Sequence, residues 1–445
     1  MSSVLTWAAS APPAMRSARL RALQASPHAM WNYVTYRDAI GLLGLDADEL
    51  YPEGTTRLPA DWADLGWLTC FCGPPASAVE AMRAAIAPEA LDVYAPDLIE
   101  PLRDEVARLL GRTRDSSFEV VGTEGAQAAI ALALLAVVDP GDEVIVGDPG
   151  YFHLPSAIIA AGGVPVAVPI GPASGYRLDP DAVAAAVTPR TRAVCVVDPV
   201  NPYGTVATAD EVMALTELCE RRGLLLIDDV THGSLAIDPA AELQVAAGEH
   251  AVAALSVSHC FGMAGARIGF LAGPRPFVRA CLQLKAGLTR LNGNLVSQRG
   301  ALVALRDAEY LRAAEATIRR NLEHLEKTLA PIDGLRLAVR PQHGLSCAVD
   351  MSGSGASAQE LMVALFARRV AVYPGDGLGD VGAADIVRLN LSNPAPWVME
   401  HVRAVLADAV AEAASGRWRE PVAALLEGKG TERASRLAAE IGGRR

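Results

Sequence analysis

The residues of this chain that are best suited to chemistry follow short runs predicted to be strands. Residues 122–127, Gly-Thr-Glu-Gly-Ala-Gln, lie between such a run and an apolar helix. Glycines there allow a phosphate to approach the backbone, and the first N–H groups of the helix face the anion. Tyr151 follows the next strand and can lay its ring on a flat heteroaromatic ligand. Taken alone, both features are more often ordinary loop packing.

Two further strand ends carry polar side chains. Asn201, in an Asn-Pro-Tyr-Gly turn, follows the run that ends at Val197 and can donate a hydrogen bond to a ligand oxygen, although an Asx turn needs no ligand. Asp228 and Asp229 close the following strand. A carboxylate buried at a strand end is costly unless it meets a cation, and a protonated pyridine nitrogen is one such partner. The order and spacing of these residues must decide between a ligand site and ordinary turns.

The elements that must position these residues alternate between short apolar runs and longer helical patterns. Strands are predicted over residues 118–121, 143–146, 164–168, 193–197, 224–227, 252–256 and 268–272. Helices are predicted over residues 126–138, 209–222 and 277–288. Near-continuous apolar strands that alternate with helices indicate a mostly parallel sheet covered by helices.

The pattern changes after Asp307. The sequence predicts a long charged helix from 309 to about 329, strands at 335–339 and 345–349, a helix at 357–367 and a strand at 370–373. Four parts are therefore predicted: an N-terminal region (1–65), a large domain (66–307), a small α+β domain with its linking helix (308–415) and a C-terminal helix or tail (416–445).

Composition argues against several classes of protein. The net charge is −12 and no basic stripe is visible, so we expect no binding to nucleic acid or to a membrane surface. The apolar run at 126–138 is too short to span a bilayer, and the N-terminus lacks the pattern of a signal peptide. Seven scattered cysteines indicate reduced thiols in a cytoplasm. Cys70 and Cys72 are close in sequence, but no second Cys or His pair has a matching spacing, so we expect no metal site.

A longer motif lies at residues 256–270, which read Ser-Val-Ser-His-Cys-Phe-Gly-Met-Ala-Gly-Ala-Arg-Ile-Gly-Phe. It resembles the lysine signature of class I/II aminotransferases, which runs Ser-x-Ser-Lys, then Phe-Gly, then Gly-x-Arg-Ile-Gly. The motifs described above occur in that family's order and at its spacings, so the resemblance covers about residues 65–410. Residues 94–97 and 102–103 resemble histidinol-phosphate aminotransferases and their decarboxylase relatives in particular.

The resemblance implies a fold and a cofactor. The fold is type I of the pyridoxal 5′-phosphate (PLP) enzymes, an α/β architecture with a large domain around a mostly parallel sheet of the seven-stranded type and a small C-terminal α+β domain. A phosphate-binding role is implied for Gly125, Ala126, Gln127, Ser256, Ser258 and Arg267. Tyr151 would stack on the pyridine ring, Asn201 would bind its phenolic oxygen and Asp228 would pair with its ring nitrogen.

Two more roles follow from the same resemblance. Tyr94 would reach the phosphate of a neighbouring subunit, which implies a homodimer. Arg388 would bind the α-carboxylate of an amino-acid substrate, a planar group that suits the guanidinium fork.

Two positions depart from the family pattern. His259 stands where the family has its lysine, and an imidazole cannot form a stable Schiff base with PLP. The three lysines of the chain all lie in helical or tail segments outside the motifs: Lys285, Lys327 and Lys429. The family's Tyr three positions after the pyridine aspartate is replaced by Thr231, with His232 next, and no role follows for either residue.

His259 can still perform one task of the missing lysine. An imidazole, with its ordinary pKa of ~6.5, suits general acid–base chemistry, and sugar 3-dehydratases of the same superfamily use a histidine here with the cofactor held non-covalently. We therefore predict an enzyme that binds PLP or pyridoxamine 5′-phosphate non-covalently. His259 would serve an elimination, tautomerisation or cyclisation of an amino-acid-like substrate in a specialised biosynthetic pathway. Transamination without a lysine, a non-catalytic binding protein and an engineered Lys→His substitution remain alternatives.

Overall fold

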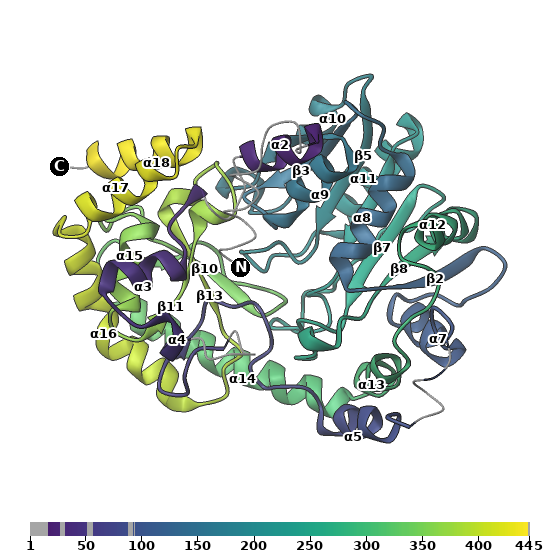
Figure 1. Cartoon of the computed structure of the whole chain (residues 1–445), viewed down its shortest axis with the longest axis horizontal. Coiled ribbons are helices and arrows are strands. Elements are labelled where there is room, and N and C mark those ends of the chain that lie inside the picture. Colours follow the sequence, from purple (N-terminus) through teal and green to yellow (C-terminus); the bar gives the residue numbers. More distant parts are fainter. Residues whose placement is uncertain (1–16, 27–31, 51–56, 88–91, 93, 444–445) are drawn as a thin grey trace.

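The computed structural model describes residues 17–26, 32–50, 57–87, 92 and 94–443 (Figure 1). A seven-stranded sheet with its helices lies on the right of Figure 1, a four-stranded sheet with its helices lies on the left, and the long helix α14 (Ala308–Leu329) runs along the bottom between them. Within the described ranges, no helix has the length and apolar character needed to cross a membrane. The same ranges contain no group of three or more His, Cys, Asp or Glu side chains placed to hold a metal ion.

The seven-stranded sheet contains every strand that the sequence predicts before residue 275. Its strands are β2 (Phe118–Thr123), β3 (Glu143–Asp148), β4 (Val164–Pro169), β5 (Thr191–Val197), β6 (Leu225–Asp229), β7 (Ala251–Ser256) and β8 (Gly269–Pro274). They lie in the order β2-β8-β7-β6-β5-β3-β4. β8 is antiparallel to β2 and β7, and the other neighbours are parallel, so the predicted mostly parallel sheet is confirmed.

Helices cover both faces of this sheet, which is why its central strands are apolar throughout. On one face lie α8 (Ala126–Val137), α9 (His153–Ala161) and α12 (Arg275–Leu288), whose apolar side chains share a core with Leu225 and Ile227 of β6. On the other face lie α10 (Pro180–Ala186) and α11 (Ala209–Arg222), in a core with Leu226. Because successive side chains of β6 point to opposite faces of the sheet, neighbouring residues pack against different helix layers.

Three further helices complete this half of the molecule: α5 (Ala76–Ala84), α7 (Glu100–Leu109) and α13 (Leu295–Leu305). α13 packs against both of the others, and α7 packs against the edge strand β2. These contacts place α5 and α7, which precede β2 in the sequence, beside α13, which follows α12.

The four-stranded sheet is antiparallel and follows α14 in the chain. Its order is β12 (Tyr373–Pro374), β13 (Ile386–Asn390), β10 (Ser346–Asp350) and β9 (Arg336–Leu337). The helices α15 (Ala358–Phe366) and α16 (Pro396–Ala414) pack together beside it. The strand predicted at 370–373 is two short strands, because β11 (Val370–Ala371) pairs with β1 (Ala63–Asp64) while β12 pairs with β13.

The N-terminal residues pack on the C-terminal part of the chain. β1 is parallel to β11, and the ring of Tyr36 in α3 (Tyr36–Leu43) stacks on that of Phe366 with 5.3 Å between centroids. The remaining helices are α2 (Ala18–Ala25), α4 (Ala47–Leu50), α17 (Arg419–Gly428) and α18 (Glu432–Gly443). Residues 1–16, 27–31 and 51–56 of the predicted N-terminal region lie outside the described residues.

Candidate active site

A cleft of about 560 Å³ lies at the carboxyl ends of β5, β6 and β7 and reaches the small sheet. Ten of the twelve site residues predicted from the sequence line it: Gly125, Ala126, Gln127, Tyr151, Asn201, Ser256, Ser258, His259, Arg267 and Arg388. Asp228 and Tyr94 do not line it. The cleft also receives side chains to which the sequence patterns gave no role: Trp67, Phe71, Phe152, Asp229, His232 and Tyr373.

The loop between β2 and α8 forms one end of the cleft. Gly125 precedes α8 with φ of +96°, and a Cβ there would lie 2.8 Å from Nη2 of Arg267. A Cβ at Gly269 would lie 2.4 Å from the carbonyl carbon of Gly125, so both positions require glycine. Arg267 donates hydrogen bonds to the carbonyls of Glu124 (2.7 Å) and Ala264 (3.2 Å). A helix N-terminus beside a fixed guanidinium suits an anionic group.

Polar atoms near this loop lack partners. Oγ of Ser258 and Oε1 of Gln127 are buried without a hydrogen-bond partner among the described residues. Nε2 of Gln127 donates to the carbonyl of His153 (3.2 Å), and Oγ of Ser256 accepts from the N–H of Ser258 (3.3 Å). Because buried polar atoms are normally hydrogen-bonded, the two unpartnered atoms indicate a polar ligand here.

The structure places Asp229, rather than the predicted Asp228, at the cleft. Both belong to β6, so their side chains point to opposite faces of the sheet. Oδ2 of Asp228 accepts from the backbone N–H of Ala246 (2.9 Å), whereas Oδ1 of Asp229 accepts from the N–H of Thr231 (3.1 Å) and from its hydroxyl. Burial raises the pKa of Asp229 to about 6, so a nearby cation would stabilise its charged form.

This one-residue shift also changes which side chain stands three positions after the aspartate. Counting from Asp229 gives His232, whereas Thr231 caps the carboxylate of Asp229. The ring of His232 lies against that of His259, with 4.6 Å between centroids and 40° between planes. Burial lowers the pKa of His232 well below its usual range, and repulsion from Arg388 and from the protonated form of His259 adds to this shift. The sequence patterns left His232 without a role, because adjacent aspartates hide the register.

His259 has a defined tautomer. Its Nδ1 contacts the carbonyl oxygen of Leu68, which can only accept, so Nδ1 carries the proton and Nε2 keeps a free lone pair. The carbonyl of His259 accepts from the N–H of Cys70 (3.1 Å). Burial lowers the pKa of His259 to about 4; the Leu68 hydrogen bond opposes this shift, and the charges of Arg388 and Arg267 add to it. The ring is therefore neutral near pH 7, and Nε2 can accept a proton.

Arg388 brings a buried positive charge from β13 to the cleft. It donates from Nη1 to Oδ1 of Asn201 (3.3 Å) and from Nη2 to the carbonyl of Gly66 (2.9 Å), and its Cζ lies 4.3 Å from the ring centroid of Tyr373. Within the described part of the chain it forms no ion pair, and its Nε has no acceptor. A buried cation without a carboxylate is costly, so this position suits a carboxylate ligand.

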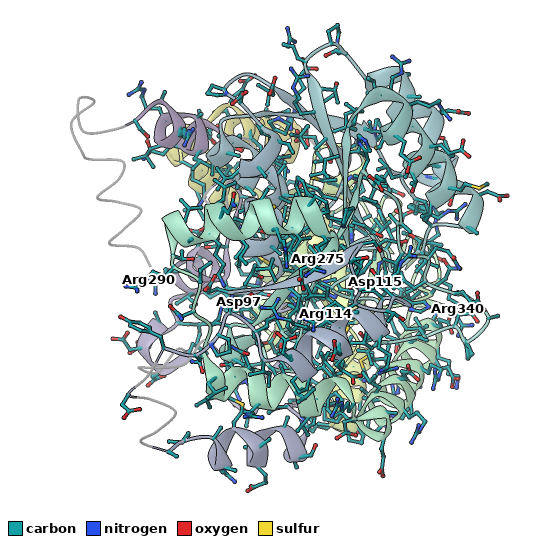
Figure 2. All side chains as sticks on the ribbon, turned by 90° about the vertical axis from the view of Figure 1, so that its right-hand side faces the viewer. Asp97, Arg114, Asp115, Arg275, Arg290 and Arg340 are labelled. Atoms are coloured by element: carbon teal, nitrogen blue, oxygen red, sulfur yellow. The ribbon has the colours of Figure 1, made fainter. Side chains whose placement is uncertain are left out.

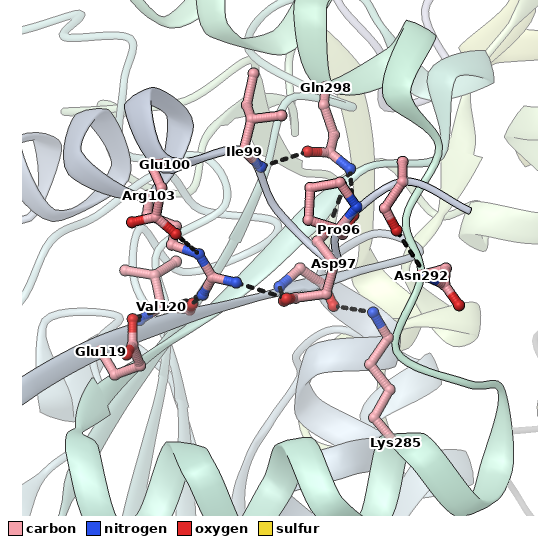
Figure 3. A network of polar contacts seen from close by, with 12 residues as sticks. Pro96, Asp97, Ile99, Glu100, Arg103, Glu119, Val120, Lys285, Asn292 and Gln298 are labelled. Atoms are coloured by element: carbon pink, nitrogen blue, oxygen red, sulfur yellow. Dashed lines mark hydrogen bonds and ion pairs between the residues drawn. The ribbon is translucent and has the colours of Figure 1, made fainter. Parts of the chain in front are cut away.

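None of the three lysines, all of which the structure describes, lines the cleft. Lys285 is buried, and its Nζ donates to the carbonyl of Gly122 (2.7 Å) within the polar network of Figure 3. Lys429 forms a 2.9 Å ion pair with an aspartate of α3, and Lys327 is exposed. Each lysine therefore has a position that keeps it away from His259.

Tyr94 lies outside the cleft of its own chain. Its side chain is 73% exposed, and Cζ of Arg290 lies 4.7 Å from its ring centroid. In Figure 2, Arg290 lies at the left of the view, and Arg114 and Arg275 lie near its centre. Any role of Tyr94 in a cofactor site would therefore concern another subunit.

Comparison with known proteins decides the family. Residues 69–406 match the family described as Aminotransferase class I and II. The chain belongs to this family. A probable aspartate/prephenate aminotransferase of Thermus aquaticus is 32% identical over 309 residues, which cover 68% of this chain and 80% of that protein. The aspartate/prephenate aminotransferase of Thermus thermophilus is 31% identical over 328 residues, which cover 71% and 83%.

Solved structures agree with this assignment. A single mutant of Thermus thermophilus aspartate aminotransferase superposes with a TM-score of 0.75 at 27% identity and covers 88% of this chain and 99% of that chain. The predicted type I fold is thereby confirmed. The relatives named above refer to aspartate and prephenate, so the narrower resemblance to histidinol-phosphate aminotransferases is not shown.

Class I and II aminotransferases use PLP, and the cleft of this family member fits that cofactor. The glycine-lined start of α8, beside Arg267 and the unpartnered hydroxyl of Ser258, suits a phosphate. Tyr151 provides a ring that can stack, and Asp229 provides a carboxylate for a protonated ring nitrogen. His259 and His232 line the same cleft beside these groups.

Proposed function

We propose that this protein is an enzyme that holds PLP or pyridoxamine 5′-phosphate without a covalent link to lysine, and that His259 moves protons at its amino-acid substrate. One observation carries the proposal: His259 lines a cleft that no lysine lines, and with its Nδ1 bound to the Leu68 carbonyl its Nε2 forms no hydrogen bond with the residues that the structure describes. The histidine stands where the family signature has lysine, so it faces the same reacting atoms.

The proposed cofactor contacts lie at two ends of the cleft, one for the phosphate and one for the ring. The phosphate-binding residues are Gly125, Ala126, Gln127, Ser256, Ser258 and Arg267. At the other end, Tyr151 stacks on the ring and Asp229 replaces the predicted Asp228 as the partner of the ring nitrogen. Oδ1 of Asn201 accepts from Arg388, so its Nδ2 remains available for the phenolic oxygen. Arg388 then binds the α-carboxylate of the substrate.

The proposal assigns proton transfer to His259. When bound, the cofactor supplies an electron sink that makes the α-hydrogen of the substrate acidic. Nε2 of His259 accepts this proton, and the imidazolium can later return it. In the free protein the pKa of His259, about 4, is low for this task, but the charges of Arg388 and Arg267 contribute to that value. A carboxylate on Arg388 and a phosphate on Arg267 would offset those charges and raise the pKa.

The loss of lysine also bears on the type of reaction. Histidine keeps the proton-transfer task, but it cannot displace the product from the cofactor as a lysine amine does. Product release then depends on hydrolysis, which limits turnover. An elimination, tautomerisation or cyclisation in a specialised biosynthetic pathway is therefore favoured over transamination.

We also propose a homodimer. Tyr94, 73% exposed and stacked with Arg290, is available to reach the cofactor phosphate of a second subunit. The narrower likeness to histidinol-phosphate aminotransferases, which rests on residues 94–97 and 102–103, stays a proposal of its own.

The test begins with the purified protein and PLP. We expect reversible binding, a visible absorbance change only when an amino acid is added, and no PLP mass on any lysine after borohydride reduction. A His259→Lys variant should turn yellow with PLP alone. Failure to bind either cofactor form, or PLP attached to Lys285 after reduction, would contradict the proposal.

The second part of the test concerns proton transfer. His259→Ala should lower product formation by about 10²–10⁴-fold, the usual contribution of a positioned acid or base. His250→Ala is the matched control, because Nδ1 of His250 also contacts a backbone carbonyl, that of Leu224 (3.1 Å), but the residue lies outside the cleft. Equal activities of the two variants would remove His259 from the mechanism. An oxo-acid product would identify the reaction as transamination without a lysine.

A further inference from the structure

The carbonyls of residues 65–69 point alternately to Asn390 and to the cleft residues Arg388 and His259. The carbonyls of Gly66 and Leu68 accept hydrogen bonds from Nη2 of Arg388 (2.9 Å) and Nδ1 of His259. The carbonyls of Trp67 and Thr69, on either side of Leu68, both accept from Nδ2 of Asn390, at 2.6 and 2.7 Å. The 65–69 segment thus lies between the cleft residues and the end of β13.

Asn390 is fully buried and uses all four of its hydrogen-bonding positions. Nδ2 donates to the carbonyls of Trp67 and Thr69, and Oδ1 accepts from the N–H (2.8 Å) and the hydroxyl (2.7 Å) of Ser392. The orientation of the amide is unambiguous, because a backbone N–H can only donate and a carbonyl can only accept. The backbone N–H of Asn390 also donates to the carbonyl of Leu65 (2.7 Å).

We infer that Asn390 is a positioning residue for His259: by holding the carbonyls of Trp67 and Thr69, it turns the Leu68 carbonyl toward Nδ1 and keeps Nε2 free to accept a proton. The hydrogen bond made by one imidazole nitrogen sets the protonation of the other. If the Leu68 carbonyl turned away, Nδ1 would lose its acceptor and the proton could move to Nε2. His259 would then be unable to accept a proton at the substrate.

Asn321 provides a comparison within the same protein. Its Nδ2 also holds two backbone carbonyls, those of Leu391 (2.8 Å) and Asn393 (2.7 Å), and its side chain is buried. These carbonyls belong to the chain just after β13. Among the described residues, Asn321 forms no hydrogen bond with the 65–69 segment or with His259. It therefore matches Asn390 in chemistry and burial but not in its connection to the cleft.

The test substitutes each asparagine by the isosteric aspartate in the full chain labelled with ¹⁵N-histidine. Long-range ¹H–¹⁵N spectra report which ring nitrogen carries the proton, and the His259 signals are assigned by their loss in His259→Gln. Asn390→Asp sets a carboxylate against two carbonyls, so we expect the Nδ1–H form of His259 to lose population to the Nε2–H form. Asn321→Asp should leave the spectrum of His259 unchanged.

Kinetics supply the second measurement. The inference rests on the proposed function, so Asn390→Asp should lower kcat by about 10²-fold, the low end for a positioned proton-transfer group, with a smaller change in KM. If Asn390→Asp does not fold, Ser392→Ala serves instead, because the hydroxyl of Ser392 donates to Oδ1 of Asn390 (2.7 Å) and its oxygen lies 3.2 Å from the Thr69 carbonyl oxygen. It should shift the tautomer in the same direction by a smaller fraction.

The outcomes separate the two proposals. A His259 ring that keeps its proton on Nδ1 in both Asn390→Asp and Ser392→Ala overturns the role of Asn390, whatever the activity. A tautomer that changes while kcat stays constant supports the positioning of His259 by Asn390 and contradicts the role of His259 in proton transfer.

Discussion

The polar network around Arg103 and the cleft around Arg388 both contain buried charged groups, but they satisfy these groups differently. In the network, Arg103 lies 2.6 Å from Asp97 and 3.5 Å from Glu119, and Lys285 donates to a carbonyl close by (Figure 3). Arg388 has only dipolar partners and the ring of Tyr373 within the described ranges. A network that neutralises its own charges supports the fold, whereas a buried charge left without its counter-ion indicates where a charged ligand binds.

The largest expected effect compares the same substitution at the two arginines. Arg103→Leu leaves Asp97 buried without its cation, so we expect the free energy of unfolding to fall by about 3–5 kcal/mol. Arg388→Leu removes a buried charge that has no counter-ion, which offsets the loss of its hydrogen bond to the Gly66 carbonyl, so the ligand-free protein should lose far less stability than with Arg103→Leu. Urea unfolding followed by circular dichroism measures both. A destabilisation by Arg388→Leu as large as that by Arg103→Leu would mean that the cleft is also satisfied internally.

The second prediction concerns the pH dependence of stability and uses Asp229. Burial raises its pKa from 3.8 to about 6, so the folded ligand-free protein holds this proton at pH values where the unfolded chain has released it. The contribution of Asp229 to stability should therefore fall as pH rises from about 4 to about 6 and stay level above that range. Asp229→Asn lacks this titration and should be more stable than the parent at pH 8 by about 3 kcal/mol, on the basis of 1.36 kcal/mol per unit.

Two controls sharpen this comparison. The stability difference should vanish only below about pH 3, well under the unfolded pKa of 3.8, where both states of the parent hold the proton. Saturating PLP should reverse the order at pH 8, because a protonated ring nitrogen would stabilise the charged carboxylate of Asp229 but not an amide. An Asp229→Asn variant that binds PLP as tightly as the parent would contradict the assignment of Asp229.

The smallest effect is expected at Lys285. Lys285→Met leaves the carbonyl of Gly122 without its donor, which should cost about 1–3 kcal/mol of stability. PLP affinity, measured by fluorescence titration, should stay within a factor of two, because the amine is tied to the network and does not reach the cleft. A large loss of PLP affinity without a matching loss of stability would show that Lys285 takes part in cofactor binding.

Much of this architecture could be predicted because it follows from apolar runs and motif spacings that are local in the sequence. The seven strands of the large sheet were all visible as apolar runs, and ten of twelve predicted site residues line the cleft. Motif spacing succeeds for most of these residues because they lie near a strand end or a helix start of the large sheet, whose parallel strands bring those ends to one edge; Arg388 instead comes from β13 of the small sheet.

The rest could not be predicted because it depends on which way a residue faces or on partners far away in the chain. Adjacent aspartates at 228 and 229 look alike in sequence, and only the register of β6 shows that Asp229 lies on the cleft side. The same register brings His232 to His259. β1 pairs with β11, and Asn390 contacts the 65–69 segment. Both contacts join segments that lie far apart in the sequence, so no local sequence pattern predicts them.

The position of Asn390 in the chain has a consequence for synthesis. The strands of the large sheet end at residue 274, so that sheet can form while the ribosome is still translating the rest. The carbonyls of Trp67 and Thr69 gain their donor only after residue 390 has emerged. Contacts between such distant residues form late, because the loop that they close is long. In a nascent chain, the seven-stranded sheet can therefore be complete before the ring of His259 has the orientation that proton transfer requires.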